Sequence, residues 1–306
     1  METIMNKERK NNYRLNVYLR ILIVILVLLV ATLSIAIALP LAKLLNLDLS
    51  ELQGNGFNPS FKVLTVIILY ASFQFFLIWL VMRLIHKQPM KVLGFNGPVL
   101  KPLLLGTAIG MLMQAIEYVL YSIFGSGASL NLSIPADVNI FAIIGYLLLN
   151  ILFLLTLNSL KEELVFRAYP INQFDDHPNS MIFLIIMVSF VFAAVHHVLS
   201  PFNLVAFTSR FTIGLLLSFV FYKWRSIWLI SGIHNGSNLL SWSIGGNYKQ
   251  GGIFDFTMET LPSSNLRIVF DIALVITFIL LFSYIWKREK QTNKLIFNIK
   301  HSESIT

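Results

Sequence analysis

Long apolar runs divide this chain into segments that can each cross a lipid bilayer. A helix of about 20 apolar residues matches the hydrocarbon thickness of a membrane. Runs of this length predict eight transmembrane helices, near residues 17–39, 61–85, 103–125, 139–160, 181–198, 202–222, 226–243 and 267–286. The pattern therefore predicts an all-α, polytopic transmembrane helical bundle.

The segments between these runs are short and contain turn-forming residues. An external loop is expected at Leu47–Ser60, and a second one at the glycine-rich residues 245–252. We find no internal repeat and no separate soluble domain. The sequence therefore predicts one membrane domain over residues 1–306, which ends in a basic cytoplasmic tail at residues 287–306 that contacts anionic lipid.

Composition excludes a soluble globular domain, because 56% of the residues are hydrophobic, only 12% are charged and the mean hydropathy is +0.74. The chain has no cysteine, which excludes disulfide bonds, a thiolate nucleophile and cysteine-based zinc sites. Any chemistry must therefore come from histidine, carboxylate, hydroxyl or amide groups.

The net charge of +8 is not spread evenly over the two sides of the predicted bundle. When the chain is threaded from a cytoplasmic N-terminus, most basic residues fall on the inner side, among them Lys7, Arg83, Lys161 and Lys287. We therefore predict a multi-pass protein of the cell membrane with both termini in the cytoplasm and no nucleic-acid partner. The first run, with Ala36-Ile37-Ala38, also resembles a secretory signal, but its length favours a retained anchor.

Ionisable residues in or beside apolar runs are the candidates for function, because a charge placed in a membrane costs about 2.5 to 3.5 kcal/mol. The first group is Glu162, Glu163 and Arg167, at the cytoplasmic end of the fourth run. On a helix Glu163 and Arg167 can form an ion pair, whereas Glu162 points about 100° away and can act as a base. A charged helix end without any function has the same appearance.

The second and third groups contain histidines. Phe192 and His196 end the fifth run, where a neutral imidazole can accept a proton, position a water or bind a metal, and Phe192 can exclude water from it. His234 and Asn238 share one helix face of the seventh run and can donate two hydrogen bonds to an oxyanion. The structural alternatives are a helix cap for His196 and a hydrogen-bonded helix contact for the other two.

Arg210, about two turns into the sixth run, needs a carboxylate or carbonyl partner. Glu162, Glu163 and Glu117 are the candidates, and Arg210 acts either in a structural ion pair or in substrate handling. Four other polar residues are expected to bridge helices, namely Gln114, Asn150, Asn158 and Asp271. Close approach of a helix or a substrate is expected at two glycines, Gly232 and Gly236.

The order of the three groups, EExxxR, FxxxH and HxxxN over residues 162–238, is more specific than any one of them. In this respect the chain resembles the CPBP intramembrane proteases, which include the CAAX prenyl endopeptidases and the bacterial Abi or bacteriocin-processing proteins. The resemblance covers about the fourth to seventh runs and indicates a CPBP-like catalytic core within residues 139–243. Ala168 departs from the glycine that many members carry after the arginine, which is a small change.

This resemblance implies that Glu162 and His196 activate the attacking water, while His234 and Asn238 stabilise the oxyanion, in a cavity between the fourth to seventh helices. Support of the site is expected from a second set of residues, Glu163, Arg167, Phe192 and Arg210. No cofactor is required by this mechanism. The alternative is a zinc site formed by Glu162, His196 and His234, although the chain contains no HExxH motif.

The sequence thus predicts an endopeptidase that acts at or within the bilayer on a small peptide or a membrane-proximal protein segment. In bacterial relatives without prenylated partners, the expected roles are processing of bacteriocin-like or signalling peptides, or self-immunity. A chain rich in Lys, Asn and Ile is typical of a low-GC bacterium. The alternative is a non-proteolytic regulator or immunity scaffold that binds a sensor kinase or a toxin receptor. A transporter is disfavoured, because the chain shows no inverted repeat.

The depths of two candidate residues conflict in this arrangement. A rise of about 1.5 Å per residue puts His196 roughly 22 Å from the start of the fifth helix at Met181, whereas Glu162 lies near the cytoplasmic side. Either the fourth helix continues past Glu162, or residues 164–180 fold so that the fifth helix starts well outside the membrane. We expect displaced, uneven helices around a water-filled cavity.

Overall fold

The structure is a computed structural model, and it describes residues 15–34, 40, 43–44, 46, 61–134, 139–149, 156–177, 180–198, 201–245 and 253–303. Several expectations concern residues outside these ranges, among them the basic residue Lys7, the segment Ala36-Ile37-Ala38, the loop at 47–60, most of the glycine-rich loop, and Asn150. The helices are α2 (Val17–Leu33), α5 (Phe61–Leu80), η1 (Val81–Ile85), η2 (Met90–Leu93), α6 (Leu100–Phe124), α7 (Ile140–Leu149), α8 (Thr156–Glu163), η4 (Leu164–Ala168), α9 (Tyr169–Gln173), α10 (Met181–Val195), α11 (Leu204–Trp224), α12 (Ile227–Gly245) and α13 (Ser264–Glu303).

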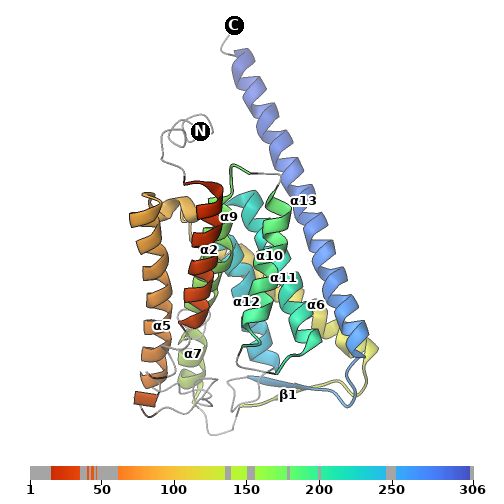
Figure 1. Cartoon of the computed structure of the whole chain (residues 1–306). Helices are drawn as coiled ribbons and strands as arrows, with labels where there is room; N and C mark the ends of the chain where they lie inside the picture. The colour runs from red at the N-terminus through yellow and green to blue at the C-terminus, as the bar shows by residue number, and fades with distance from the viewer. Residues whose placement is uncertain are drawn as a thin grey trace.

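These helices stand side by side in one bundle, as Figure 1 shows. Within the described part of the chain, four helices are long and apolar enough to cross a membrane, at Ile68–Ile85, Leu100–Phe124, Leu204–Trp224 and Ser264–Glu289. Two shorter apolar helices are α2 and α10. A multi-pass helical membrane protein is therefore confirmed, and the remaining spans of the eight stay a prediction.

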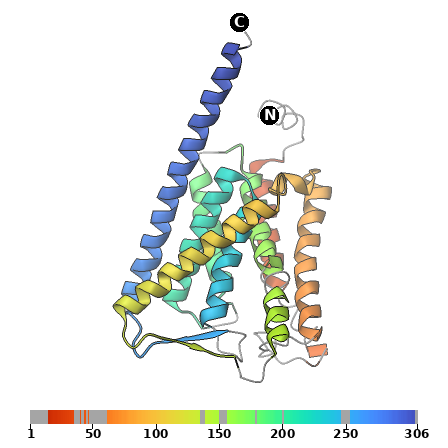
Figure 2. The same ribbon diagram turned by 180° about the vertical axis from the view of Figure 1, so that it is seen from behind.

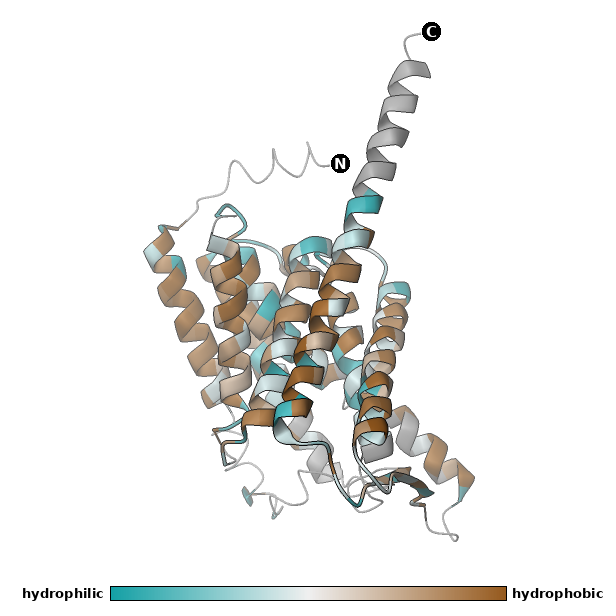
Figure 3. Ribbon diagram, turned by 90° about the vertical axis from the view of Figure 1, so that its right-hand side faces the viewer, coloured by the Kyte–Doolittle hydropathy of each residue, from teal (hydrophilic) through white to brown (hydrophobic). Residues whose placement is uncertain are grey.

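The outer surface of the bundle is apolar. Large side chains such as Leu22, Phe76, Leu105, Phe183 and Leu280 are each more than half exposed. Figure 3 shows apolar residues along most of the length of the helices. A soluble monomer rarely exposes so much apolar surface, and lipid is the solvent that fits this one.

Helices α6 and α12 pack closely because glycines remove the side chains between them. Gly106 and Gly110 of α6 lie against the backbone of α12, while Gly232 and Gly236 of α12 lie against the backbone of α6. A Cβ atom at any of the four would overlap a carbonyl oxygen of the other helix. The close approach predicted at Gly232 and Gly236 is confirmed, with α6 as the neighbour. Figure 2 shows α6 running obliquely across the bundle.

A small β-ribbon adds to the helices, so the fold is mostly rather than entirely helical. Strand β1 (Ser129–Leu132) pairs antiparallel with β2 (Phe254–Thr257), and Ser129 faces Thr257 in this register. Both strands alternate small polar with large apolar side chains, which favours extended backbone. The ribbon ties the segment after α6 to the one before α13, at the end of the bundle opposite the end of α13 (Figure 1).

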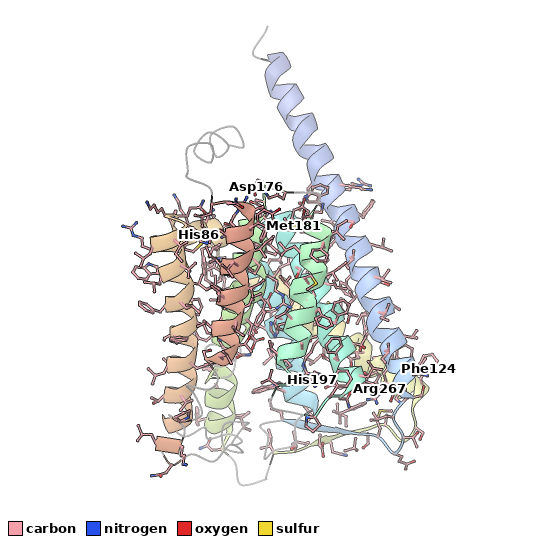
Figure 4. The ribbon with its side chains drawn as sticks, in the orientation of Figure 1. His86, Phe124, Asp176, Met181, His197 and Arg267 are labelled. Atoms are coloured by element: carbon pink, nitrogen blue, oxygen red, sulfur yellow. The ribbon has the colours of Figure 1, made fainter. Side chains whose placement is uncertain are left out.

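The fourth helix continues past Glu162, through η4 and α9 to Gln173, which is roughly 15 Å further along its axis. Pro170 has no N–H to donate to the carbonyl of Phe166, and the wider π turn η4 lies at this point. Helix α10 then runs back from Met181, which lies near Asp176 at one end of the bundle, towards His197 (Figure 4). Of the two alternatives for bringing His196 to the depth of Glu162, the structure therefore shows the first, in which the fourth helix continues past Glu162.

Candidate active site

The predicted ion pair between Glu163 and Arg167 is confirmed. Arg167 donates from Nη1 to Glu163 Oε1 over 3.0 Å, and both side chains are fully buried. The guanidinium of Arg167 also lies 3.8 Å from the centre of the Phe192 ring. Arg167 lies within the π turn η4, which begins directly after Glu163.

Glu163 has a second partner that the sequence did not indicate. Nδ1 of His234, from α12, donates to Glu163 Oε1 over 2.7 Å. The sequence predicted Glu163 only as the partner of Arg167, because helical spacing shows neighbours within one helix and this contact joins residues 71 positions apart. Glu163 therefore orients the imidazole of His234 as well as pairing with Arg167.

Glu162 lies between a lysine and a histidine. Its Oε1 is 3.5 Å from Nζ of Lys161, and its Oε2 is 3.8 Å from Nε2 of His234. Lys161, which was counted among the charges of the inner membrane side, is buried in the bundle: its side chain is only 4% exposed, and its Nζ lies 4.5 Å from the centre of the Tyr70 ring. Lys161 is therefore an internal counter-ion of Glu162.

Phe192 forms the apolar wall that was predicted beside His196. The two rings are 4.7 Å apart, and Phe192 also contacts Phe166 and His234 at 5.5 and 6.2 Å between ring centres. Nδ1 of His196 faces the carbonyl oxygen of Phe192 at 2.7 Å. An N–H on Nδ1 makes that bond, so Nε2 of the neutral ring is the nitrogen that can accept a proton.

His234 and Asn238 lie one turn apart on α12 and are both partly buried. The next residue towards His234, Ser237, donates to Oε1 of Gln114 on α6 over 3.0 Å. The prediction that Gln114 bridges helices is therefore confirmed. This bond and the glycine contacts fix α12 against α6, and so they fix the level at which His234 and Asn238 sit.

Arg210 has a carbonyl partner, one of the two kinds expected. Its Nη1 donates to the carbonyl oxygen of Ala206, one turn earlier in α11, over 3.3 Å. None of the three carboxylates named for it forms an ion pair with it among the described residues. One turn further along α11, a Cβ atom added at Gly214 would be 3.2 Å from Nη2 of Arg167, so this part of α11 borders the buried ion pair of the site.

The candidate residues come from α8 and η4, from α10 and the residue that directly follows it, and from α11 and α12, which lie in the fourth to seventh predicted runs and the segment after the fourth. Within the described chain, no three side chains of His, Cys, Asp or Glu are arranged so that they could hold a metal ion. The zinc site considered above, from Glu162, His196 and His234, is therefore not among the arrangements that the described residues form.

Comparison with known proteins bears on the segment that holds these residues. Residues 144–240 match the model of the family described as type II CAAX prenyl endopeptidase Rce1-like. The segment is CPBP-like. No curated protein and no solved structure matches the chain. The CPBP-like segment begins in α7 and ends in α12, so it contains all the candidate residues and suggests an intramembrane endopeptidase of the CAAX type.

Proposed function

We propose that this protein hydrolyses peptide bonds with a water molecule activated by Glu162 and His196. The observation that carries the proposal is the arrangement around His234, whose two ring nitrogens face Glu163 at 2.7 Å and Glu162 at 3.8 Å. Residues from distant helices therefore meet inside a segment that resembles CAAX endopeptidases. A charged helix end without function would not need this convergence.

Activation of water is assigned to Glu162. Lys161 and His234 flank its two oxygens, and both favour the carboxylate, which is the form that accepts a proton. His196 positions the same water through Nε2, because its Nδ1 is engaged with Phe192. Oxygen of the water bonds to the peptide carbonyl carbon while its proton passes to Glu162.

Stabilisation of the oxyanion is assigned to His234 and Asn238. With Nδ1–H donated to Glu163, His234 can donate from Nε2 only as the doubly protonated ring. Glu162 and Glu163, one at each nitrogen, are the carboxylates that balance this charge. Glu162 then returns its proton to the leaving nitrogen, the C–N bond breaks, and a carboxylate and an amine are released.

The substrate class follows from the position of the site in an apolar bundle. The substrates that we assign to the site are small peptides or membrane-proximal segments of proteins. Both kinds reach the site from within or beside the lipid bilayer. Processing of bacteriocin-like or signalling peptides, or self-immunity, in a bacterial cell membrane is the biological role proposed. No step of this mechanism uses a metal, so a chelator should leave cleavage unchanged.

The test is peptide cleavage by the purified protein in detergent, with Glu162→Gln and His234→Ala compared with the unmodified chain. Both substitutions should lower kcat by at least about 10²-fold, the usual contribution of a general base or an oxyanion donor. Glu259→Gln, at an exposed acidic residue, is the matched control. Unchanged cleavage in both variants would refute the mechanism. A cellular phenotype that survives both changes would indicate the non-proteolytic regulator instead.

A further inference from the structure

Arg210 differs from the other cations inside the bundle in having no carboxylate beside it. Among the described residues, Arg20 pairs with Asp176, Arg167 with Glu163, Lys161 with Glu162, and Arg225 with Asp175. The only hydrogen bond of the Arg210 guanidinium in this part of the chain is the 3.3 Å contact with Ala206. A guanidinium has five N–H donors in a planar fork, so most of its donor capacity remains available.

The charges of the site leave room for one more anion. Three permanent cations, Lys161, Arg167 and Arg210, outnumber the two carboxylates Glu162 and Glu163. The excess is one positive charge while His234 is neutral, and it grows to two when the ring is doubly protonated. An excess charge is costly in an apolar bundle unless a partner balances it. Of the three cations, Arg210 is the one without a carboxylate in contact and is partly exposed.

Arg210 lies beside the site but is not in contact with the groups that would react. It lies on α11 one turn before Gly214, and a Cβ atom added at Gly214 would be 3.2 Å from Nη2 of Arg167, whose partner Glu163 binds His234. Arg210 itself forms no ion pair with Glu162 or Glu163 among the described residues. A peptide that presents its scissile bond to Glu162 would therefore pass close to this guanidinium.

We propose that Arg210 binds a carboxylate of the peptide substrate and thereby selects which peptide bond reaches Glu162. This inference rests on the endopeptidase function proposed above and adds a specificity residue to it. Guanidinium and carboxylate form two parallel hydrogen bonds of fixed geometry, so the pair fixes both position and direction of the peptide. The carboxylate comes either from the C-terminus of the peptide or from an Asp or Glu side chain.

The experiment uses the full-length protein in detergent and three matched mixtures of short peptides. One mixture lacks Asp and Glu and ends in a free carboxylate, the second is the same mixture as C-terminal amides, and the third is amidated but carries one Glu. We expect one of the carboxylate-bearing mixtures to be cleaved about 10- to 100-fold more efficiently than the amide, the range expected for charge-assisted hydrogen bonds. Which mixture is preferred identifies the source of the carboxylate.

In Arg210→Gln the ratio of cleavage efficiencies between the preferred mixture and the amide mixture should fall towards one, mainly through a change in KM. Arg210→Lys should keep part of the preference because the charge remains. Arg83→Gln, at an exposed arginine of η1, is the matched control and should keep the full preference. Equal cleavage of all three mixtures by the unmodified protein would overturn the proposal and leave the endopeptidase function intact. The same conclusion follows if Arg210→Gln lowers all three rates by one factor.

A binding measurement separates failure of this proposal from failure of the proposed function. Trialanine as the free acid should raise the thermal unfolding temperature of the unmodified protein more than trialanine amide does, and Arg210→Gln should abolish the difference. If no mixture is cleaved but this difference is present, the carboxylate site stands and the endopeptidase function fails. Equal stabilisation by trialanine acid, trialanine amide and Ala-Glu-Ala amide would contradict the carboxylate site.

Discussion

Glu163 is fully buried and is shared by Arg167 and His234, so removal of the arginine leaves a buried carboxylate with one weaker partner. We expect Arg167→Met to lower the free energy of unfolding by about 3–5 kcal/mol, as is usual when one partner of a buried ion pair is removed. Thermal or denaturant unfolding in detergent measures this. The double variant with Glu163→Gln should recover part of the loss, and a double variant less stable than Arg167→Met would contradict the explanation.

Lys161 balances the charge of Glu162 from within the protein, at 3.5 Å and nearly out of contact with solvent. Lys161→Met should therefore reduce kcat by about tenfold or more with little change in KM, because the carboxylate loses its counter-ion while the peptide-binding surface is kept. Lys161→Arg should retain more activity, since the charge is preserved. A loss confined to KM would show that Lys161 contacts the peptide instead.

His86 provides a pH dependence of stability outside the membrane spans. Burial, followed by the charge of Arg20, lowers the pKa of His86 from its usual 6.5 to about 4, and its Nε2 lies 3.0 Å from the hydroxyl of Tyr169. Between these two pKa values His86 is protonated in the unfolded chain but neutral in the folded protein. The free energy of unfolding should therefore fall as the pH drops from about 6.5 towards 4. The unfolding temperature of His86→Gln should fall less over this range. Parallel pH profiles would contradict the assignment.

At the scale of residues, the sequence identified those whose type is unusual for their surroundings. Glu162, His196 and His234 stand out because ionisable groups are rare in apolar runs. The bond between Glu163 and His234 was not predictable, since it joins two helices whose relative rotation depends on packing. The burial of Lys161 was not predictable either, since its charge was counted at a helix end and the helix in fact continues past it.

At the scale of elements, the contact between α6 and α12 depends on glycine, because the backbones of the two helices touch directly. A methyl group added at Gly110 would overlap the carbonyl of Ile233, whereas one added at Gly145 of α7 meets no atom within 4 Å. We expect Gly110→Ala to cost about 1–3 kcal/mol of stability and to lower kcat, because α12 carries His234. Gly145→Ala is the matched control and should change neither. Equal effects of the two substitutions would refute the role of this contact.

Helix existence was easier to predict than helix ends. The apolar runs located the helices because burial in lipid needs a minimum length of apolar sequence. The end of the fourth helix was placed too early, since Lys161, Glu162 and Glu163 look like a solvated terminus although they face other helices. The β-ribbon was also missed, because two four-residue strands far apart in the chain give almost no periodic signal.

At the scale of the whole molecule, helices outside the CPBP-like segment hold it in place. Arg20 of α2 donates to Asp176 and to the carbonyl of Gln173, which fixes the end of α9. Tyr70 of α5 covers Lys161, and Gln114 of α6 binds Ser237. The first half of the chain, which carries no recognisable motif, therefore acts as the frame that positions the candidate site.

The orientation of this frame in the membrane is open to a direct test, because the chain has no cysteine and accepts single cysteines as unique labels. Lys91 and Asn131 are both exposed, and they lie in η2 near His86 and in β1, at opposite ends of the bundle (Figures 1 and 4). The excess of basic residues at the end that holds η2 predicts that this end is cytoplasmic. In intact cells a membrane-impermeant maleimide should therefore label Asn131→Cys but not Lys91→Cys, and permeabilised cells should label both. Labelling of Lys91→Cys alone in intact cells would show that the orientation is inverted.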